Sequence, residues 1–337
     1  MRAVASTSPV QFRPALAATR HLADRMAVVM LVVLAAAVLA FGSDYWVLAS
    51  QIAIFMLFAV SVDLLVGFAG IVTLGHAVFF GLGAYAFGLA SLRLGWSEPL
   101  SGLLIGGLAA AVLAFATSLL VLRTRGLGQL MLTMAFAALM LEVANSLKSL
   151  TGGDDGLQNI VVAPILGRFE FDLYGRVAYI YAVAVLAGAM ALIAAIIASP
   201  YGRSLVGIRE NRTRMMAIGT NVTQRLQSAY VLSAFVAGIA GACLAQTTQF
   251  VGLNTLHFQS SGEALVMLAL GGPGRLWGAA LGAVMFMVLK DRLSTMEPAY
   301  WYFWLGLILT LTVLFAPRGL MGLLDALAAR WLARGRA

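Results

Sequence analysis

Long apolar runs separated by short polar segments follow one another along most of the chain. An α-helix needs about 20 apolar residues to cross the hydrocarbon core of a bilayer, because each residue adds about 1.5 Å. The pattern predicts ten membrane-spanning helices, of which the eighth is unusually short. They are expected at residues 26–41, 46–67, 71–90, 100–122, 127–147, 177–198, 227–248, 261–271, 276–289 and 300–315.

The eighth and ninth spans come from one apolar region, 260–289, which is about 30 residues long and therefore too long for a single span. The sequence G-G-P-G-R at 271–275 interrupts this region. Proline and glycine disfavour a continuous helix, so we predict a break there.

A polar segment at 199–225 separates two very hydrophobic parts of the chain. Its arginines alternate with leucine, isoleucine and methionine, whereas a plain solvated linker needs no apolar residues. We therefore expect a pair of short amphipathic helices that dock on another molecule.

The charges indicate which side of the membrane each segment occupies. With ten spans, both termini, 199–225 and Arg275 share one side, which then carries 16 of the 22 basic residues and 3 of the 14 acids. Such an excess marks the cytoplasmic side. The sequence thus predicts two cytoplasmic termini.

Composition agrees with this class. The chain is 61% hydrophobic and 11% charged, with mean hydropathy +0.93, whereas soluble domains carry about 25% charged residues. The fold class is therefore an all-α, polytopic membrane protein. The net charge of +8 does not indicate nucleic-acid binding, because the basic residues lie in short loops beside apolar spans, as expected for a protein in a lipid bilayer. A single cysteine, Cys243, excludes an internal disulfide and a cysteine metal site.

Three regions are expected along the chain: a basic extension at 1–25, a transmembrane domain at 26–316 and a cytoplasmic tail at 317–337. The extension has the basic character of a transit peptide, but we favour a cytoplasmic segment.

Three acids lie within predicted spans: Asp63, Glu142 and Glu263. A charge inside a bilayer is costly, so each is either part of a proton relay or solute contact, or paired with another residue near a helix end. His76, with Thr73 nearby, has no second metal ligand one turn away. It either lines a path or forms a hydrogen bond between helices.

No phosphate-binding G-x-x-x-x-G-K-[ST] motif occurs in the chain, although T-G-G-D-D-G-L at 151–157 has the look of a metal or phosphate loop. Any nucleotide that drives transport must therefore bind another subunit. No serine–histidine–acid or paired-carboxylate pattern indicates an enzyme.

Several motifs together resemble a known family: G-F-A-G-I-V-T-L-G-H-A, S-L-T-G-G-D-D-G-L, Y-G-R-S-L-V-G-I-R-E-N, L-G-G-P-G-R-L-W-G and F-A-P-R-G-L-M-G-L. These motifs occur in the order typical of one family, and the chain resembles the LivM-type permease subunit of branched-chain amino-acid ABC importers. The resemblance implies a type II importer permease in the bacterial inner membrane. It also implies a LivH-type permease partner, two ATPase subunits that use ATP, and a periplasmic substrate-binding protein. The chain itself would bind no cofactor and would not be an enzyme.

The resemblance further implies that 209–221 is the coupling helix that docks on an ATPase. Its candidate residues are Arg209, Glu210, Asn211, Met215, Met216, Ala217, Gly219 and Asn221. The basic and methionine-rich centre departs from the small and acidic residues that family members often carry.

Two other surfaces follow from the resemblance. The binding protein would meet the loop residues Thr151, Asp154, Asp155 and Asp172, although a simple capped turn explains them equally well. The translocation path would be lined by the third, fifth and eighth spans. The candidates on this path are Thr73, His76, Asn145 and Glu263.

Two alternatives remain open. The same kind of importer could carry another small solute, such as urea, a short-chain amide or an aromatic acid. A secondary transporter driven by protons or sodium through the acids within the spans would need no ATPase subunit.

Overall fold

The computed structural model describes residues 14–41, 45–165, 167–171, 175–315 and 319–334. Among these residues the regular structure is helical, and extended pairing is limited to two isolated bridges. The α-helices are α1 (Pro14–Phe41), α2 (Trp46–Asp63), α3 (Ala77–Leu94), α4 (Pro99–Val121), α5 (Leu127–Ser146), α6 (Lys148–Thr151), α7 (Arg176–Ala198), α8 (Pro200–Glu210), α9 (Arg212–Ala217), α10 (Val222–Thr248), α11 (Phe258–Gly271), α12 (Leu276–Met296), α13 (Trp301–Phe315) and α14 (Gly319–Arg334). Three short segments have other helical geometries: η2 (Leu64–Ala69), η3 (Gly153–Asp155) and η4 (Leu253–Leu256).

The predicted all-α membrane class is confirmed. Within the described residues, six helices are long and apolar enough to cross a bilayer: α2 with η2, α3, α4, α5, α7 and α10. Counting the bent pair α11–α12 as one span gives seven. The predicted first span lies within α1, which starts 12 residues earlier, and the tenth coincides with α13, so a helix lies at each of the ten expected positions. The chain is a multi-pass membrane protein, and ten is an approximate number of spans.

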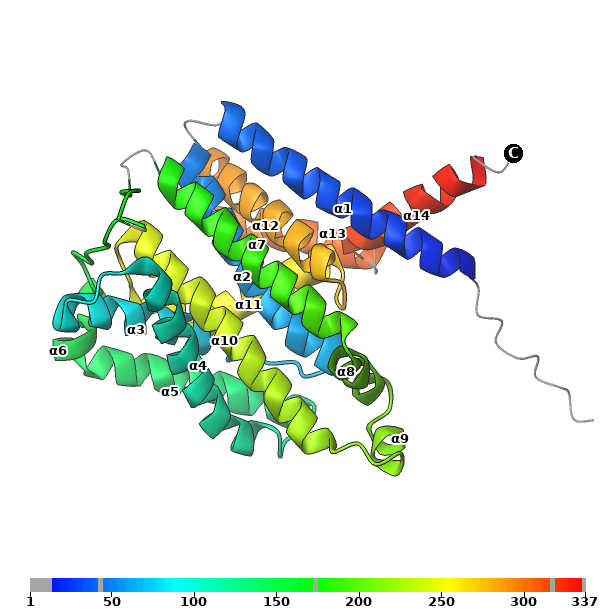
Figure 1. Ribbon diagram of the computed structural model, residues 1–337, viewed down its shortest axis with the longest axis horizontal. Helices are drawn as coiled ribbons and strands as arrows, with labels where there is room; N and C mark the ends of the chain where they lie inside the picture. Colours follow the sequence, from blue (N-terminus) through cyan, green and yellow to red (C-terminus); the bar gives the residue numbers. More distant parts are fainter. Residues whose placement is uncertain (1–13, 42–44, 166, 172–174, 316–318, 335–337) are drawn as a thin grey trace, which may run out of the picture.

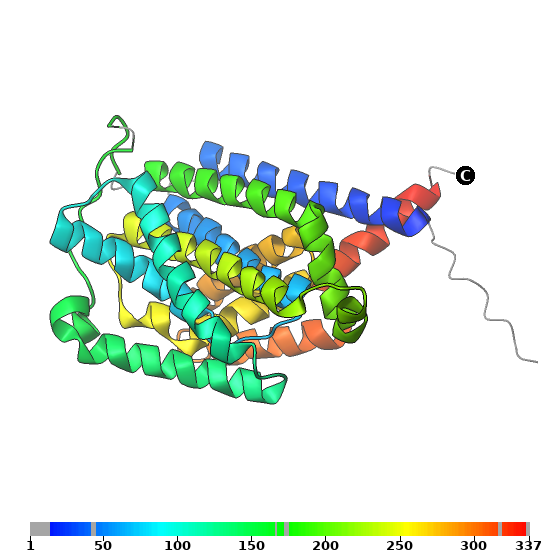
Figure 2. The same cartoon turned by 60° about the horizontal axis from the view of Figure 1, so that its bottom comes forward.

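The helices run between two ends of the molecule (Figure 1). The short helices α8 and α9 lie at one end, with the beginning of α1 and with α14, and we refer to it as the α8 end. The helix α6 lies at the other, the α6 end. In Figure 2, α5 forms one edge of the helix group. This arrangement separates the polar segment 199–225 from the loop that contains T-G-G-D-D-G-L.

The centre of the molecule is formed by α10, which packs closely against α2, α3 and α4, while α2 packs in turn against α7 and α12. Small residues allow the close approach, since a Cβ on Gly83 or Gly106 would clash with Gly238 of α10. In a bilayer such contacts replace the hydrophobic driving force between helices.

The third span begins later than predicted. The helix α3 starts at Ala77, whereas residues 70–76 are irregular. The π-helix η2 is followed by Gly70, whose φ of +70° is left-handed, and the Ile71 N–H then donates to the Leu65 carbonyl (3.0 Å). Non-helical backbone at membrane depth is tolerated where protein surrounds it or where it lines a water-filled cavity. Ile71, Gly75 and His76 are buried, which fits the first condition.

The predicted break at 271–275 is confirmed, since the chain bends there by 114° between α11 and α12. The shortness of α11 also has an explanation. Residues 249–257 fold inward beside α3, where Val251 pairs with Leu157 and Leu256 lies against Gly81. The Ser261 hydroxyl of α11 then accepts the Ala77 N–H at the start of α3 (2.7 Å). The missing length of the eighth span is thus supplied by a segment outside α11 that includes only the short helix η4.

Candidate functional site

The segment 199–225 forms two short helices, α8 and α9, as predicted, and side-chain caps fix both of them. Ser199 Oγ accepts the Tyr201 N–H at the start of α8 (3.2 Å), and Asn211 Oδ1 accepts the Arg214 N–H at the start of α9 (2.9 Å). Asn221 Oδ1 accepts the Gln224 N–H where α10 begins (3.2 Å). Such caps satisfy the free N–H groups of a first helical turn. Asn211 and Asn221 therefore hold the shape of this corner.

The side chains of α8 and α9 divide between an inward and an outward face. Leu205 and Ile208 are completely buried against the helices of the membrane domain. Met215 lies against Gly207 of α8, with its sulfur 2.8 Å from the position of a Cβ there. Met216 and Ile218 point outward and are 51% and 69% exposed. Exposed apolar side chains beside arginines are typical of a docking surface.

The remaining coupling candidates also lie at this corner. Glu210 and Ala217 are exposed, and so is Gly219, whose φ of +86° is left-handed. Arg209 is also exposed, but it has a contact that the others lack. Its guanidinium turns toward the membrane domain and donates a hydrogen bond to the Gly67 carbonyl.

His76 is completely buried and joins α2 to α10. Its Nε2 lies 3.1 Å from Ser61 Oγ and 3.3 Å from Ser233 Oγ. Both serine hydroxyls donate elsewhere, Ser61 to the Phe58 carbonyl (2.6 Å) and Ser233 to the Ser61 carbonyl (2.5 Å). Both therefore accept from the imidazole, and the proton belongs on Nε2. This arrangement corresponds to the interhelical hydrogen bond that the sequence left open.

Thr73 is buried beside His76. Its hydroxyl oxygen accepts the Gly75 N–H (3.1 Å), and Thr133 of α5 accepts the Leu74 N–H (3.2 Å). Segment 70–76 is thereby tied to α5. With Thr73 and His76 enclosed, their predicted contact with a translocating solute remains untested.

Glu263 on α11 forms an ion pair with Lys290 on α12 (2.8 Å). The acid is therefore paired across the bend. Glu142 on α5 is exposed, and Asn145 is half-buried with no hydrogen-bond partner for its side-chain oxygen within the part of the chain that the structure describes. Asp63 accepts the Gly274 N–H (2.7 Å).

The loop candidates at the α6 end separate into two kinds. Thr151 is buried, and its hydroxyl donates to the Ala144 carbonyl at the end of α5 (2.6 Å). Asp154 and Asp155 are exposed and able to meet a partner. Asp172 lies outside the described residues. Thr151 thus fits the capped turn better than the docking surface.

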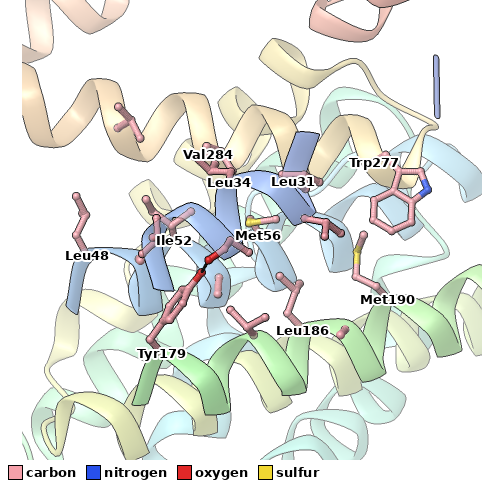
Figure 3. A pocket seen from close by; sticks show the side chains of 18 of the residues that line it. Leu31, Leu34, Leu48, Ile52, Met56, Tyr179, Leu186, Met190, Trp277 and Val284 are labelled. Atoms are coloured by element: carbon pink, nitrogen blue, oxygen red, sulfur yellow. Dashed lines mark hydrogen bonds between the residues drawn. The ribbon is translucent and has the colours of Figure 1, made fainter. Parts of the chain in front are cut away.

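An apolar cavity lies elsewhere, between α1, α2, α7 and α12 (Figure 3). It measures about 550 Å³, and its walls include Leu31, Ile52, Met56, Leu186 and Trp277. A strongly polar solute would find few partners among these side chains. Its lining residues come from other helices than the predicted path on α3, α5 and α11, so the cavity is separate from that path.

Sequence reasoning missed the partners of the buried polar groups. No sequence signal marked Ser61 and Ser233, because serine is common in membrane helices. Lys290 was not marked either, because this residue directly follows the predicted span 276–289, where a lysine is common. Within the described ranges, no group of three or more His, Cys, Asp or Glu side chains is placed to hold a metal ion.

The fold combines long apolar helices with a span that is broken at G-G-P-G and with irregular backbone buried at membrane depth. These are features of polytopic transport proteins built around discontinuous helices.

Comparison with known proteins identifies the family within this class. Residues 46–313 match the family described as "Branched-chain amino acid transport system / permease component". The chain belongs to this family of transport permeases.

Two similar relatives are high-affinity branched-chain amino acid transport system permease proteins named LivM. The protein from Salmonella typhimurium is 26% identical over 299 residues, covering 81% of this chain and 69% of the relative. The protein from Escherichia coli is 26% identical over 292 residues, covering 80% and 68%. No solved structure matches the chain.

Proposed function

We propose that the chain is a permease subunit of an ATP-driven ABC importer and forms half of a translocation pathway for branched-chain amino acids. The family match over 46–313 is the observation that carries this proposal. In this role the chain is not an enzyme and binds no cofactor, and ATP is bound and hydrolysed by partner subunits.

The second half of the pathway is assigned to a LivH-type permease subunit. The exposed side of α5 supports this assignment, since Leu127 and Met131 project from a helix that makes few contacts with the rest of the chain. An apolar side of this kind fits the interface with a second permease.

Two ATPase subunits are placed at the α8 end and a periplasmic binding protein at the α6 end. The outward-facing Met216 and Ile218 support the first placement, and the exposed Asp154 and Asp155 support the second. The excess of basic residues at the α8 end supports cytoplasmic termini and an inner-membrane location.

The test is uptake by proteoliposomes that hold the chain, its permease partner and both ATPase subunits. We expect uptake of radiolabelled leucine from the loaded binding protein only when ATP is present on the ATPase side. ATP-dependent uptake of urea, an amide or an aromatic acid instead of leucine would assign a different solute to the same machine. Uptake that follows a proton or sodium gradient without the ATPase subunits would overturn the proposal.

A further inference from the structure

Four residues from three distant parts of the chain meet at the α8 end. Asp63 is the last residue of α2, and Gly67 lies in η2 directly after it. Arg209 is in the last turn of α8, and Gly274 belongs to the break between α11 and α12. We refer to Asp63, Gly67, Arg209 and Gly274 as the inner junction.

Two hydrogen bonds hold the inner junction together. The Gly274 N–H donates to Asp63 Oδ1 (2.7 Å), and Arg209 Nη1 donates to the Gly67 carbonyl. One bond therefore attaches the α11–α12 break to α2, and the other attaches α8 to η2.

The backbone of the junction has no room for a Cβ at its glycines. A Cβ on Gly67 would overlap the Asp63 carboxylate, and one on Gly274 would lie 2.9 Å from Arg209 Nη1. Gly70 is equally close to the arginine, with 2.9 Å between its Cβ position and Arg209 Cγ. Since close-packed contacts transmit displacement, a shift of Arg209 moves the backbone at Gly67 and Gly274.

Charge adds a second connection. Asp63 is completely buried, and its Oδ2 has no hydrogen-bond partner among the residues that the structure describes. Arg209 is the cationic side chain of the junction, and its bond to the Gly67 carbonyl holds it on the same turn of backbone that follows Asp63. A buried carboxylate needs such a counter-charge, because an unpaired charge away from water is costly.

The break is also anchored on its other side. Arg275 forms an ion pair with Asp325 of α14 (2.9 Å), and Gly319 at the start of α14 lies against Gly272. The four residues of the break are thus held between α2 and α8 on one side and α14 on the other.

We propose that Arg209 is a positioning residue that links α8 to the bend between α11 and α12. A displacement of α8 reaches Gly274 through Gly67 and Asp63 and changes the 114° angle of the broken span. This inference rests on the proposed function for the origin of the displacement, which is the ATPase pair. Arg209 then acts within the membrane domain, whereas Met216 and Ile218 serve as the outward contact.

The first test measures solute uptake per ATP hydrolysed in the reconstituted complex. Arg209→Met is expected to lower this ratio by at least about fivefold, the lower limit of a typical coupling energy. Arg209→Lys keeps the charge and is expected to restore most of it. Arg123→Met removes an exposed arginine outside 199–225 and is the matched control, with a ratio near wild type.

A double variant tests the pairing itself. Asp63→Asn keeps an oxygen for the Gly274 N–H but removes the charge that faces Arg209. If the two residues act as one unit, Asp63→Asn with Arg209→Met costs little more than the worse single change. Additive losses, or a wild-type ratio in Arg209→Met, would overturn the inference.

The second test needs no ATPase and therefore separates this inference from the proposed function. Spin labels at Gln259→Cys and Met296→Cys, in a Cys243→Ser background, report the distance between the far ends of α11 and α12. Arg209→Met is expected to shift or broaden this distance in the purified chain, and Arg123→Met to leave it unchanged. An unchanged distance in Arg209→Met means that Arg209 does not position the bend, whatever the chain transports.

Discussion

Single polar residues in this protein serve mainly to join helices that are far apart in the sequence. His76 connects Ser61 on α2 with Ser233 on α10 through one ring nitrogen. The sequence predicted that a lone buried histidine would either bridge helices or line a path, since its neighbourhood contains no metal ligand. It could not identify the partners, because Ser233 lies 157 positions away.

The bridging role gives a prediction for His76→Phe. The aromatic ring fills the space but leaves both serine oxygens without their donor, so the free energy of unfolding should fall by about 1–3 kcal/mol. Thermal unfolding in detergent measures this loss, and Ser233→Ala, which removes one of the two acceptors, should cost less. Uptake per folded molecule should stay close to wild type. A variant that is stable but inactive would instead place His76 on the solute path.

At the scale of elements, the helix positions could be predicted from hydropathy and the irregular segments could not. Residues 71–76 are as apolar as the helix that follows, so composition does not distinguish them. Their conformation is set by the left-handed Gly70 and by Thr133 and Ser261 on other helices. The break at 271–275 was predictable because proline and glycine act locally.

The ion pair between Glu263 and Lys290 stabilises the bend between two elements, and it gives a second prediction. Glu263→Gln leaves the partly buried ammonium without its counter-charge and should lower stability by about 1–3 kcal/mol. Exchanging the charges, Glu263→Lys with Lys290→Glu, should restore part of the loss. The check is a double-mutant cycle by thermal unfolding. If Glu263 carried a coupling proton, Glu263→Gln would also abolish the pH dependence of uptake, an outcome that contradicts a purely structural pair.

At the scale of the whole molecule, the two ends have different chemistry. The α8 end combines arginines with the exposed Met216 and Ile218, and the α6 end presents Asp154 and Asp155. The two short helices that the sequence predicted within 199–225 are present as α8 and α9. It did not indicate that Met215 turns inward against Gly207 or that Arg209 faces the membrane domain, because both depend on how α8 packs.

The difference between the two ends of the molecule gives a third prediction, which concerns Met216→Asp. A carboxylate in place of an exposed thioether should weaken an apolar contact with an ATPase by about 2 kcal/mol or more. The measurement is the fraction of ATPase subunits that co-purify with the chain and the solute-stimulated ATP hydrolysis. Thr213→Asp adds the same charge to α9 without removing apolar surface and is the control. Equal losses in the two variants would indicate a general charge effect rather than a methionine contact.

The shortness of α11 has a consequence for how the protein enters the membrane during synthesis. Fourteen residues extend only about 21 Å, less than the roughly 30 Å of a bilayer core, and they include Glu263. The counter-charge for this acid, Lys290, is translated 27 residues later. We therefore expect α11 to enter the membrane together with α12, after the ribosome has passed Lys290. The order of translation thus sets when this part of the transporter becomes complete.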